Sequence, residues 1–147
     1  MFRKILVPTD NSALSRKAVK AAMAFARIHK AKVIGFHATE RFEVLAYGEY
    51  FPPDLVNAAE WDKRVQRVAE KVLAMVEKEA RAAKVACETL QAPAMSPWEG
   101  IVEAARKNKC DLIFMASHGR TGLGGLLLGS QSSKVLSHSK TPVLIYK

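Results

Sequence analysis

Strand-like apolar runs alternate with longer helical segments along the chain, and this alternation restricts the possible folds more than any other feature. The strand-like runs cover residues 5–8, 31–39, 84–92, 110–117 and 141–147. Segments of helical periodicity cover residues 11–30, 58–83, 96–109 and 130–139. Continuous apolar strands separated by helices predict a parallel sheet covered on both faces. With right-handed crossovers, we expect a doubly wound α/β fold with five strands in the order 3-2-1-4-5.

Several helical segments carry start signals or apolar stripes. Asn11 or Ser12 is a natural N-cap for the first helix. At the third helix, Ser96 and Glu99 form the pattern of a capping box, and Pro97 takes the first helical position. Two stripes at helical spacing are expected to face the core. They comprise Leu14, Ala18, Ala22, Phe25 and Ile28 in the first helix and Trp61, Val65, Val68, Val72 and Met75 in the second.

The length and composition indicate one cytoplasmic domain. The 147 residues, of which 49% are apolar, fit a single domain over 1–147 with one sizeable core. No apolar run approaches the roughly 20 residues that span a bilayer, and no signal-peptide pattern is present. Cys87 and Cys110 lack metal-ligand spacing, so we interpret them as small buried thiols in a reducing compartment. We therefore expect a cytoplasmic protein with no membrane partner.

The net charge of +9 favours anionic partners such as nucleotides, nucleic acids or anionic lipids. The basic residues are spread thinly, however, and short clusters such as "DKRVQR" and "RKNK" fall on expected helices, where a solvated face accounts for them. The chain also lacks a nucleic-acid recognition motif and a stripe of mixed aromatic and basic residues. Nucleic acid is therefore not the expected partner.

Residues 41–57 show no clear period, and the pair Pro52-Pro53 would end any helix. We interpret this stretch as a long excursion loop between the second strand and the second helix. Its aromatic residues either pack on the domain itself or cover a ligand, and the sequence leaves both possibilities open.

Glycine is concentrated between residues 119 and 129, directly after the fourth strand and before the last helix. Glycine lets a backbone approach a ligand closely, and the N-terminus of a following helix favours an anion. The segment does not match GxxxxGK[ST], because Ser130 stands where lysine is required, nor GxGxxG, because Leu127 replaces the third glycine. We therefore expect an anion site of another type, at the carboxyl edge of the sheet where "VPTDNS" follows the first strand.

The arrangement resembles the universal stress protein family, in the branch that binds adenine nucleotides through the pattern G-x2-G-x9-G-[ST]. Gly119, nine residues, Gly129 and Ser130 match this pattern. "ILVPTDNS", "DLIFMASHGRTG" and "TPVLIYK" are similar to the first, fourth and last strands of the family with their loops, so the resemblance covers essentially the whole chain. It implies a Rossmann-like fold and bound ATP or AMP, which could carry Mg²⁺ on its phosphates.

The resemblance implies a role for each residue of the nucleoside side of the site. Asp10 would contact the adenine, in a pocket shaped by Pro8 and Thr9 and lined by Ala38. The residues that would approach the ribose are Met115 and Ala116.

The resemblance also implies the residues of the phosphate side. Backbone N–H groups would supply most of the contacts, and His118 would orient the loop. Arg120, the one charged side chain beside the loop, would either contact phosphate or be solvated. The residues expected around the phosphates are Gly119, Gly129, Ser130, Gln131 and Ser132.

Ala116 departs from the family pattern, which has a glycine at that position. If the position requires a left-handed backbone or close contact with the ribose, a methyl group costs about 1 kcal/mol, the usual scale of a difference between glycine and alanine. We expect this to weaken nucleotide binding without abolishing it.

The sequence favours a nucleotide-binding regulatory protein of the stress response that signals through its conformation or its partners. Near the expected phosphates it offers no convincing water-activating base and no committed arginine finger, so any hydrolysis is expected to be slow. A flavin- or adenylate-using enzyme would need substrate-site residues that the sequence does not reveal. The alternative from another class is a nucleic-acid-binding or chaperone-like module, whose polyanion binding would collapse with added salt.

The last strand-like run, from Pro142 to Lys147, is expected at an edge of the sheet. Val143 and Ile145 would face one way and Leu144 and Tyr146 the other, so both faces are apolar. An unpaired edge invites another strand, and a two-fold axis would make the pairing antiparallel and closed. Many members of the family dimerise through this strand. We therefore expect a homodimer that Leu144→Pro shifts toward monomer by removing a ladder donor.

Overall fold

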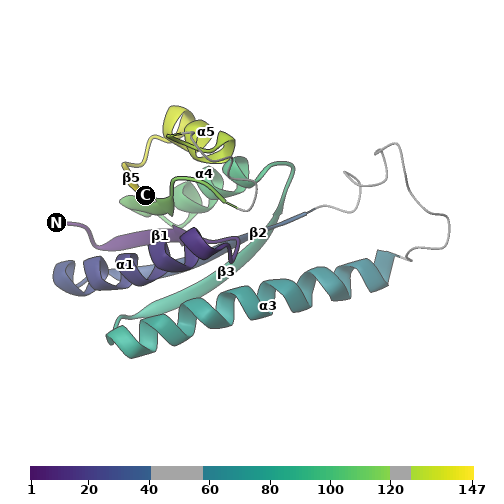
Figure 1. Cartoon of the computed structure of the whole chain (residues 1–147), viewed down its shortest axis with the longest axis horizontal. Helices are drawn as coiled ribbons and strands as arrows, with labels where there is room; N and C mark the ends of the chain where they lie inside the picture. Colours follow the sequence, from purple (N-terminus) through teal and green to yellow (C-terminus); the bar gives the residue numbers. More distant parts are fainter. Residues whose placement is uncertain (41–57, 120–126) are drawn as a thin grey trace.

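The computed structural model describes residues 1–40, 58–119 and 127–147. Five strands and four helices alternate in this part of the chain, as predicted (Figure 1). They are β1 (Lys4–Pro8), α1 (Ala13–His29), β2 (Lys32–Glu40), α3 (Ala58–Ala83), β3 (Cys87–Ala94), α4 (Pro97–Lys107), β4 (Leu112–Ala116), α5 (Ser130–His138) and β5 (Val143–Tyr146). The excursion loop expected at residues 41–57 lies outside the described residues.

The five strands form one parallel sheet in the order β3-β2-β1-β4-β5, which confirms the predicted topology. β1 lies at the centre, where Ile5 is opposite Val33 of β2 and Leu112 of β4. From β1 to β3, each successive strand is added on one side of β1, whereas β4 and β5 are added on the other side. The strand order therefore reverses between β1 and β4.

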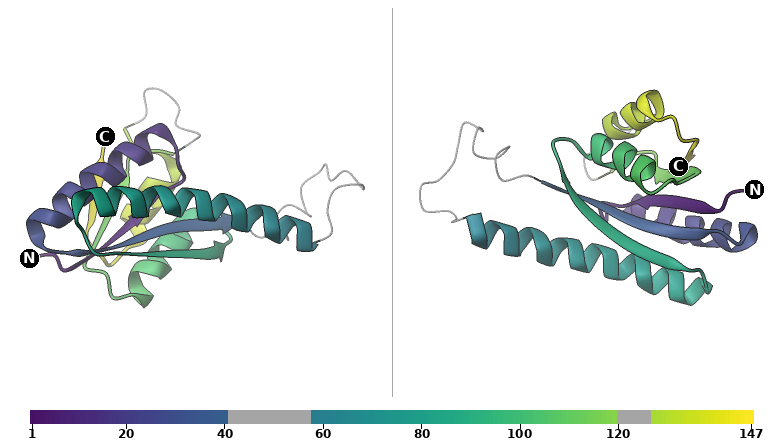
Figure 2. Two further views of the ribbon diagram at one scale, coloured as in Figure 1. Left: turned by 90° about the horizontal axis from the view of Figure 1, so that it is seen from below. Right: turned by 180° about the vertical axis from the view of Figure 1, so that it is seen from behind.

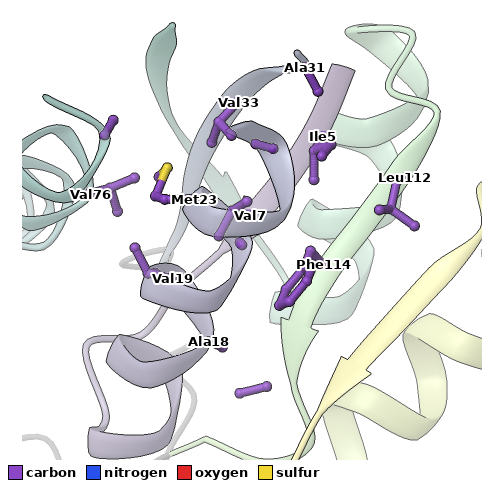
Figure 3. Close-up of a cluster of buried hydrophobic side chains, with 14 residues drawn as sticks. Ile5, Val7, Ala18, Val19, Met23, Ala31, Val33, Val76, Leu112 and Phe114 are labelled. Carbon is purple, nitrogen blue, oxygen red and sulfur yellow. The ribbon is translucent and has the colours of Figure 1, made fainter. Parts of the chain in front are cut away.

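Helices cover both faces of the sheet, with α1 and α3 on one face and α4 and α5 on the other (Figures 1 and 2). Side chains alternate along β1, so that Ile5 and Val7 pack in the layer with α1 while Leu6 packs in the layer with α4. Figure 3 shows the first layer, in which Val19 and Met23 of α1 lie among the strand residues. The core is therefore built on both faces, as continuous apolar strands predict.

α1 begins as predicted, and most of its predicted stripe packs in the core. Its N-cap is Ser12, whose hydroxyl accepts a hydrogen bond from the Ser15 N–H at 3.2 Å. The predicted stripe is wrong at Ile28, which is 77% exposed. The helix lies on the sheet mainly through alanines, which allow close packing, and this contact face is rotated away from Ile28. The buried face consists of Ser15, Ala18, Val19, Ala22, Met23 and Ala26.

α3 has the predicted bounds, but its stripe is buried mainly toward the C-terminus. Val72 is buried, whereas Val68, one step earlier in the predicted stripe, is 42% exposed. Figure 2 shows the reason: the first turns of α3 extend beyond the strands. Where the helix packs on β2, Gly35 leaves the necessary space, because a Cβ there would lie 2.7 Å from Cγ1 of Val76.

α4 starts at Pro97 as predicted, but its cap is not the expected capping box. Ser96 is the N-cap by backbone conformation, and its side chain makes no capping hydrogen bond. The Trp98 N–H donates instead to Oε1 of Gln131 in α5, at 3.0 Å. A side chain from another helix thus supplies the acceptor at this end of α4.

Among the helices that the structure describes, none is long and apolar enough to cross a bilayer. Cys110 is buried, and the loss of solvent around it raises the pKa of its thiol to about 11. Cys87 is half-buried at the sheet edge, and desolvation raises the pKa of this thiol as well. Both cysteines therefore remain protonated at neutral pH, and the prediction of a buried thiol is confirmed for Cys110, whereas Cys87 is only half-buried.

Candidate functional site at the carboxyl ends of β1 and β4

The predicted site residues lie at the edge of the sheet where the strand order reverses, between β1 and β4. β1 and β4 are neighbouring parallel strands, so their carboxyl ends open at the same edge of the sheet. Crevices at such a reversal are the usual ligand sites of doubly wound sheets. The turn after β1 and the segment between β4 and α5 meet at this edge.

The turn after β1 is held by a dense set of hydrogen bonds around Thr9. Its N–H donates to the Phe36 carbonyl at 2.9 Å, and its buried hydroxyl lies 3.0 Å from the Ser15 hydroxyl. The same hydroxyl accepts from the Asn11 N–H at 3.2 Å. Pro8, the last residue of β1, is buried beneath the turn. The two residues expected to shape a pocket are therefore mainly interior supports.

Asp10 reaches from this turn toward the β4 side. Its Oδ1 accepts from the Ser12 N–H at 2.9 Å, which fixes one end of the carboxylate. Its Oδ2 lies so close to Gly119 that a Cβ added to that glycine would be 2.3 Å from the oxygen. The structure thus brings together Asp10 and Gly119, as the prediction requires, and gives the glycine a steric reason.

Met115 and Ala116 form the buried end of β4, with 6% and 7% of their surface exposed. Ala116 pairs with Tyr146 of β5 and keeps ordinary strand geometry. It is not among the non-glycine residues with positive φ in the described part of the chain, which are Asn11, Lys30, Lys84 and Lys109. The backbone strain that we considered for alanine at this position is therefore absent.

Gly129 closes the segment by packing on the chain just after β4. Its N–H donates to the Ser117 carbonyl at 2.7 Å, and a Cβ at Gly129 would lie 3.1 Å from Cα and Cβ of His118. Gly129 is also the N-cap of α5. The first N–H groups of a helix have no acceptor inside that helix, so α5 presents donors at this edge.

The side chains of the first turn of α5 have different roles. Ser132 is 2% exposed and donates its hydroxyl to the Ala116 carbonyl at 3.0 Å, which ties α5 to the end of β4. Gln131 caps α4 through Trp98. Ser130 is exposed. Of these three residues, Ser130 has an exposed hydroxyl, while the side chains of Gln131 and Ser132 are already bonded within the protein, so these two offer mainly their backbone N–H groups.

The remaining predicted residues lie around this centre. Nδ1 of His118 is 3.1 Å from the Ser117 hydroxyl, a contact between adjacent side chains just after β4. Ala38 is half-buried on the face of β2 that α4 covers. A Cβ added to Gly100 of α4 would lie 3.6 Å from the Cβ of Ala38. Arg120 lies outside the described residues. In the ranges that the structure does describe, no group of three or more His, Cys, Asp or Glu residues could hold a metal ion.

Two residues of the site escaped the sequence analysis as site residues. His37 of β2 is half-buried, and its Nδ1 lies 2.9 Å from the Thr9 carbonyl oxygen. Ser15 supports Thr9 from inside α1 and donates its hydroxyl to the Ser12 carbonyl at 3.0 Å. A lone histidine in a strand and a serine in a helical pattern carry no spacing signal, so only the fold reveals their contact with the turn.

Comparison with known proteins identifies the family of this fold. A model of the universal stress protein family matches residues 1–147. The universal stress protein MJ0531 of Methanocaldococcus jannaschii is 31% identical over 147 residues, an alignment that covers 100% of this chain and 83% of the relative. The solved structure of MJ0577, from the same organism, superposes with a TM-score of 0.83 at 30% identity and covers 100% of this chain and 96% of that one.

Two further solved structures contain nucleotides. A universal stress protein in complex with cAMP has a TM-score of 0.71 at 27% identity, with 99% of this chain and 97% of that chain covered. A universal stress protein family protein from Arabidopsis thaliana with AMP bound has a TM-score of 0.69 at 15% identity, with 99% and 91% covered, and at this identity it bears on the fold alone. With a family model matching residues 1–147 and a relative 31% identical, this chain belongs to the universal stress protein family.

Proposed function

We propose that this protein binds an adenine nucleotide, ATP or AMP, and acts as a regulatory protein of the stress response. The observation that carries the proposal is the apposition of Asp10 and Gly119, which brings a carboxylate from the β1 turn to the glycine segment after β4. The donors at the start of α5 lie at the same edge of the sheet, because Gly129 and Ser132 bond back to the chain at the end of β4. The cAMP complex of a relative supports this ligand class.

The chemistry of the two sides matches the two ends of such a nucleotide. An ionised carboxylate only accepts hydrogen bonds, so Asp10 suits the exocyclic amine of adenine. The N-terminus of α5 suits a phosphate, since it combines unpaired N–H groups with the positive end of the helix dipole. The ligand would then lie across the edge with its base at the β1 turn and its phosphates at α5.

We propose binding with at most slow hydrolysis. In the described part of this edge, the titratable side chains of Asp10, His37 and His118 already have structural contacts, with Ser12, Thr9 and Ser117 respectively. Any Mg²⁺ would be held mainly by the phosphates of the nucleotide, because the described residues offer no cluster of metal ligands. We also propose a cytoplasmic site of action, which suits two free cysteines.

Isothermal titration at physiological salt tests the main proposal. ATP and AMP should each bind with one site per chain, and mass spectrometry of the purified protein should detect a bound adenine nucleotide. A protein that gives neither heat nor a thermal shift with millimolar ATP or AMP would contradict the proposal.

One observation favours the alternative of a polyanion-binding module. Between residues 11 and 39 the chain contains six basic residues and no acidic residue. Five of them are exposed along α1 and its C-cap: Arg16, Lys17, Lys20, Arg27 and Lys30. Binding to a phosphate polymer through this helix should fall steeply between 50 and 200 mM salt, whereas nucleotide binding at the sheet edge should persist (these concentrations span the range over which about six phosphate contacts lose roughly a thousandfold in affinity).

We further propose a homodimer through β5, and the structure changes which residue tests it. The carbonyls of Pro142, just before β5, and Tyr146 accept hydrogen bonds from the N–H groups of Ile113 in β4 and of Ser117 just after it. The even-numbered residues along β5 therefore direct their backbone N–H and C=O groups toward β4. Leu144→Pro would therefore break the β4–β5 pairing, and that test was wrongly chosen. The odd-numbered residues direct their backbone groups to the open edge.

Ile145→Pro is the appropriate substitution, because it removes a donor from the open edge of the sheet. Sedimentation equilibrium should give twice the chain mass of 16.2 kDa for the parent protein and a lower mass for the variant. A parent protein that stays monomeric at tens of micromolar would refute this pairing.

A further inference from the structure

His37 contacts the turn that carries Asp10, although it lies on a different strand. Its Nδ1 is 2.9 Å from the carbonyl oxygen of Thr9. A carbonyl oxygen can only accept a hydrogen bond, so Nδ1 carries the proton and donates it. Thr9 also donates its own N–H to the carbonyl of Phe36, the residue before His37. Phe36 and His37, two consecutive residues of β2, therefore bond to the N–H and the carbonyl of Thr9 respectively.

Because the peptide bond is planar, the hydrogen bond to the Thr9 carbonyl also restricts Asp10. In a trans peptide, the carbonyl of one residue and the N–H of the next point in opposite directions. By holding the Thr9 carbonyl, His37 fixes the plane of the Thr9–Asp10 peptide and with it the direction in which Asp10 leaves the turn. The next residue, Asn11, has a φ of 63°, in the left-handed region that asparagine adopts more readily than most other non-glycine residues, so the chain turns sharply just after Asp10.

The carboxylate of Asp10 is confined on its other sides. Oδ1 is bonded to the Ser12 N–H at 2.9 Å, and Oδ2 lies against Gly119. The direction of Cα–Cβ is the remaining variable, and the peptide held by His37 sets it. A rotation of that peptide would swing the carboxylate along the edge of the sheet.

We propose that His37 is a positioning residue that determines base selectivity by orienting Asp10. The inference rests on the proposed adenine-nucleotide site. Adenine presents an amine, a donor, at the ring position where guanine presents a carbonyl, an acceptor. A correctly directed carboxylate favours the amine and opposes the carbonyl, whereas a loosely directed one discriminates less.

Two substitutions at His37 separate the hydrogen bond from the bulk of the side chain. His37→Leu removes the donor. His37→Asn keeps one, because its amide nitrogen is attached to Cγ just as Nδ1 is. His138→Leu, on an exposed histidine at the far end of α5, is the matched control. ATP and GTP affinities are measured for all four proteins by titration calorimetry, and circular dichroism checks their folding.

His37→Leu should lower the ratio of ATP affinity to GTP affinity about five- to tenfold, the scale of one hydrogen bond, mainly through weaker ATP binding. His37→Asn should restore most of the ratio, and His138→Leu should match the parent. A ratio that His37→Leu leaves unchanged, or that His37→Asn lowers equally, would overturn the selectivity role. If the leucine variant does not fold, His37→Gln replaces it, since its nitrogen is one bond farther from Cβ.

A measurement without nucleotide separates this inference from the proposed function. Amide hydrogen exchange at Asn11 and Ser12, whose N–H groups are bonded within the turn, should quicken in His37→Leu but not in His37→Asn. Unchanged exchange would overturn the positioning role. A parent protein that binds neither ATP nor GTP would refute the proposed function and the selectivity role together, while the exchange data would still decide whether His37 holds the turn.

Discussion

The two segments that meet at the carboxyl edge of the sheet are held in place by different physical means. The turn after β1 depends on side-chain chemistry, since Thr9, Ser15, Asp10 and His37 all make hydrogen bonds within it or to it. On the β4 side, the hydrogen bonds of Gly129 and Ser132 are joined by a steric limit that the turn lacks, because a Cβ at Gly119 would lie 2.3 Å from Asp10 and one at Gly129 would lie 3.1 Å from His118. The first should therefore be sensitive to lost donors and acceptors, and the second to added atoms.

Gly129→Val should give the largest effect, because it adds branched volume against His118. A Cβ alone would lie 3.1 Å from that residue's Cα. Overpacking of this kind costs about 1–3 kcal/mol, so both the stability to urea and the affinity for ATP should fall. Unchanged urea stability would show that α5 can shift away from β4.

Gly119→Ala should act mainly on binding. Its methyl group would come within 2.3 Å of Asp10 Oδ2, the end of a half-buried side chain, so the carboxylate would have to leave its bonded position while the rest of the fold adjusts little. ATP affinity should fall at least about tenfold, or 1.4 kcal/mol, by calorimetry, with little change in melting temperature. If this variant binds ATP as tightly as the parent protein, Asp10 does not contact the nucleotide.

Thr9→Val should test the hydrogen-bonded side of the comparison. The isosteric change deletes the hydroxyl shared with Ser15 and leaves the Asn11 N–H without its acceptor. Loss of a buried polar partner costs about 1–3 kcal/mol of unfolding free energy, measurable by urea denaturation. Ser132→Ala is the matched control on the other side, where one hydroxyl bond to Ala116 is lost, so its cost should be smaller. If Thr9→Val and Ser132→Ala lower the unfolding free energy equally, the proposed difference between the two segments is wrong.

Ala116→Gly should have the smallest effect. Because Ala116 has ordinary strand geometry, glycine relieves no strain there and only adds freedom to the unfolded chain. We expect a loss of about 0.5–1 kcal/mol in unfolding free energy. A clear gain in ATP affinity would show that the methyl group obstructs the ligand directly.

Much of the architecture could be predicted because it rests on local signals. Apolar runs closed by Pro8 or introduced by Pro142, and helices capped at Ser12 or begun at Pro97, are visible in any window of a few residues. Alternation of such elements leaves few topologies, which is why the strand order was predicted correctly. The pairing of Asp10 with Gly119 followed from the same topology, since both lie just beyond neighbouring strands.

The errors concern contacts between elements that are distant in sequence. Ile28 and Val68 belong to regular stripes, but the rotation of α1 and the length of α3 beyond the sheet decide which side chains are covered. Gln131 caps a helix that precedes it by more than thirty residues. The backbone direction of Leu144 depends on its register with β4. No periodicity within one segment encodes any of these relations.

The hydrogen bond from Trp98 to Gln131 makes the order of one helix conditional on the other. If α5 detaches from the edge of the sheet, the first turn of α4 loses its acceptor at the same moment, so the two helix starts should open as one cooperative unit. Anything that holds the start of α5 would then also slow the opening of α4. The ring of Trp98 also packs against His138 in a tilted arrangement with ring centroids 4.6 Å apart, so this one residue of α4 contacts both ends of α5.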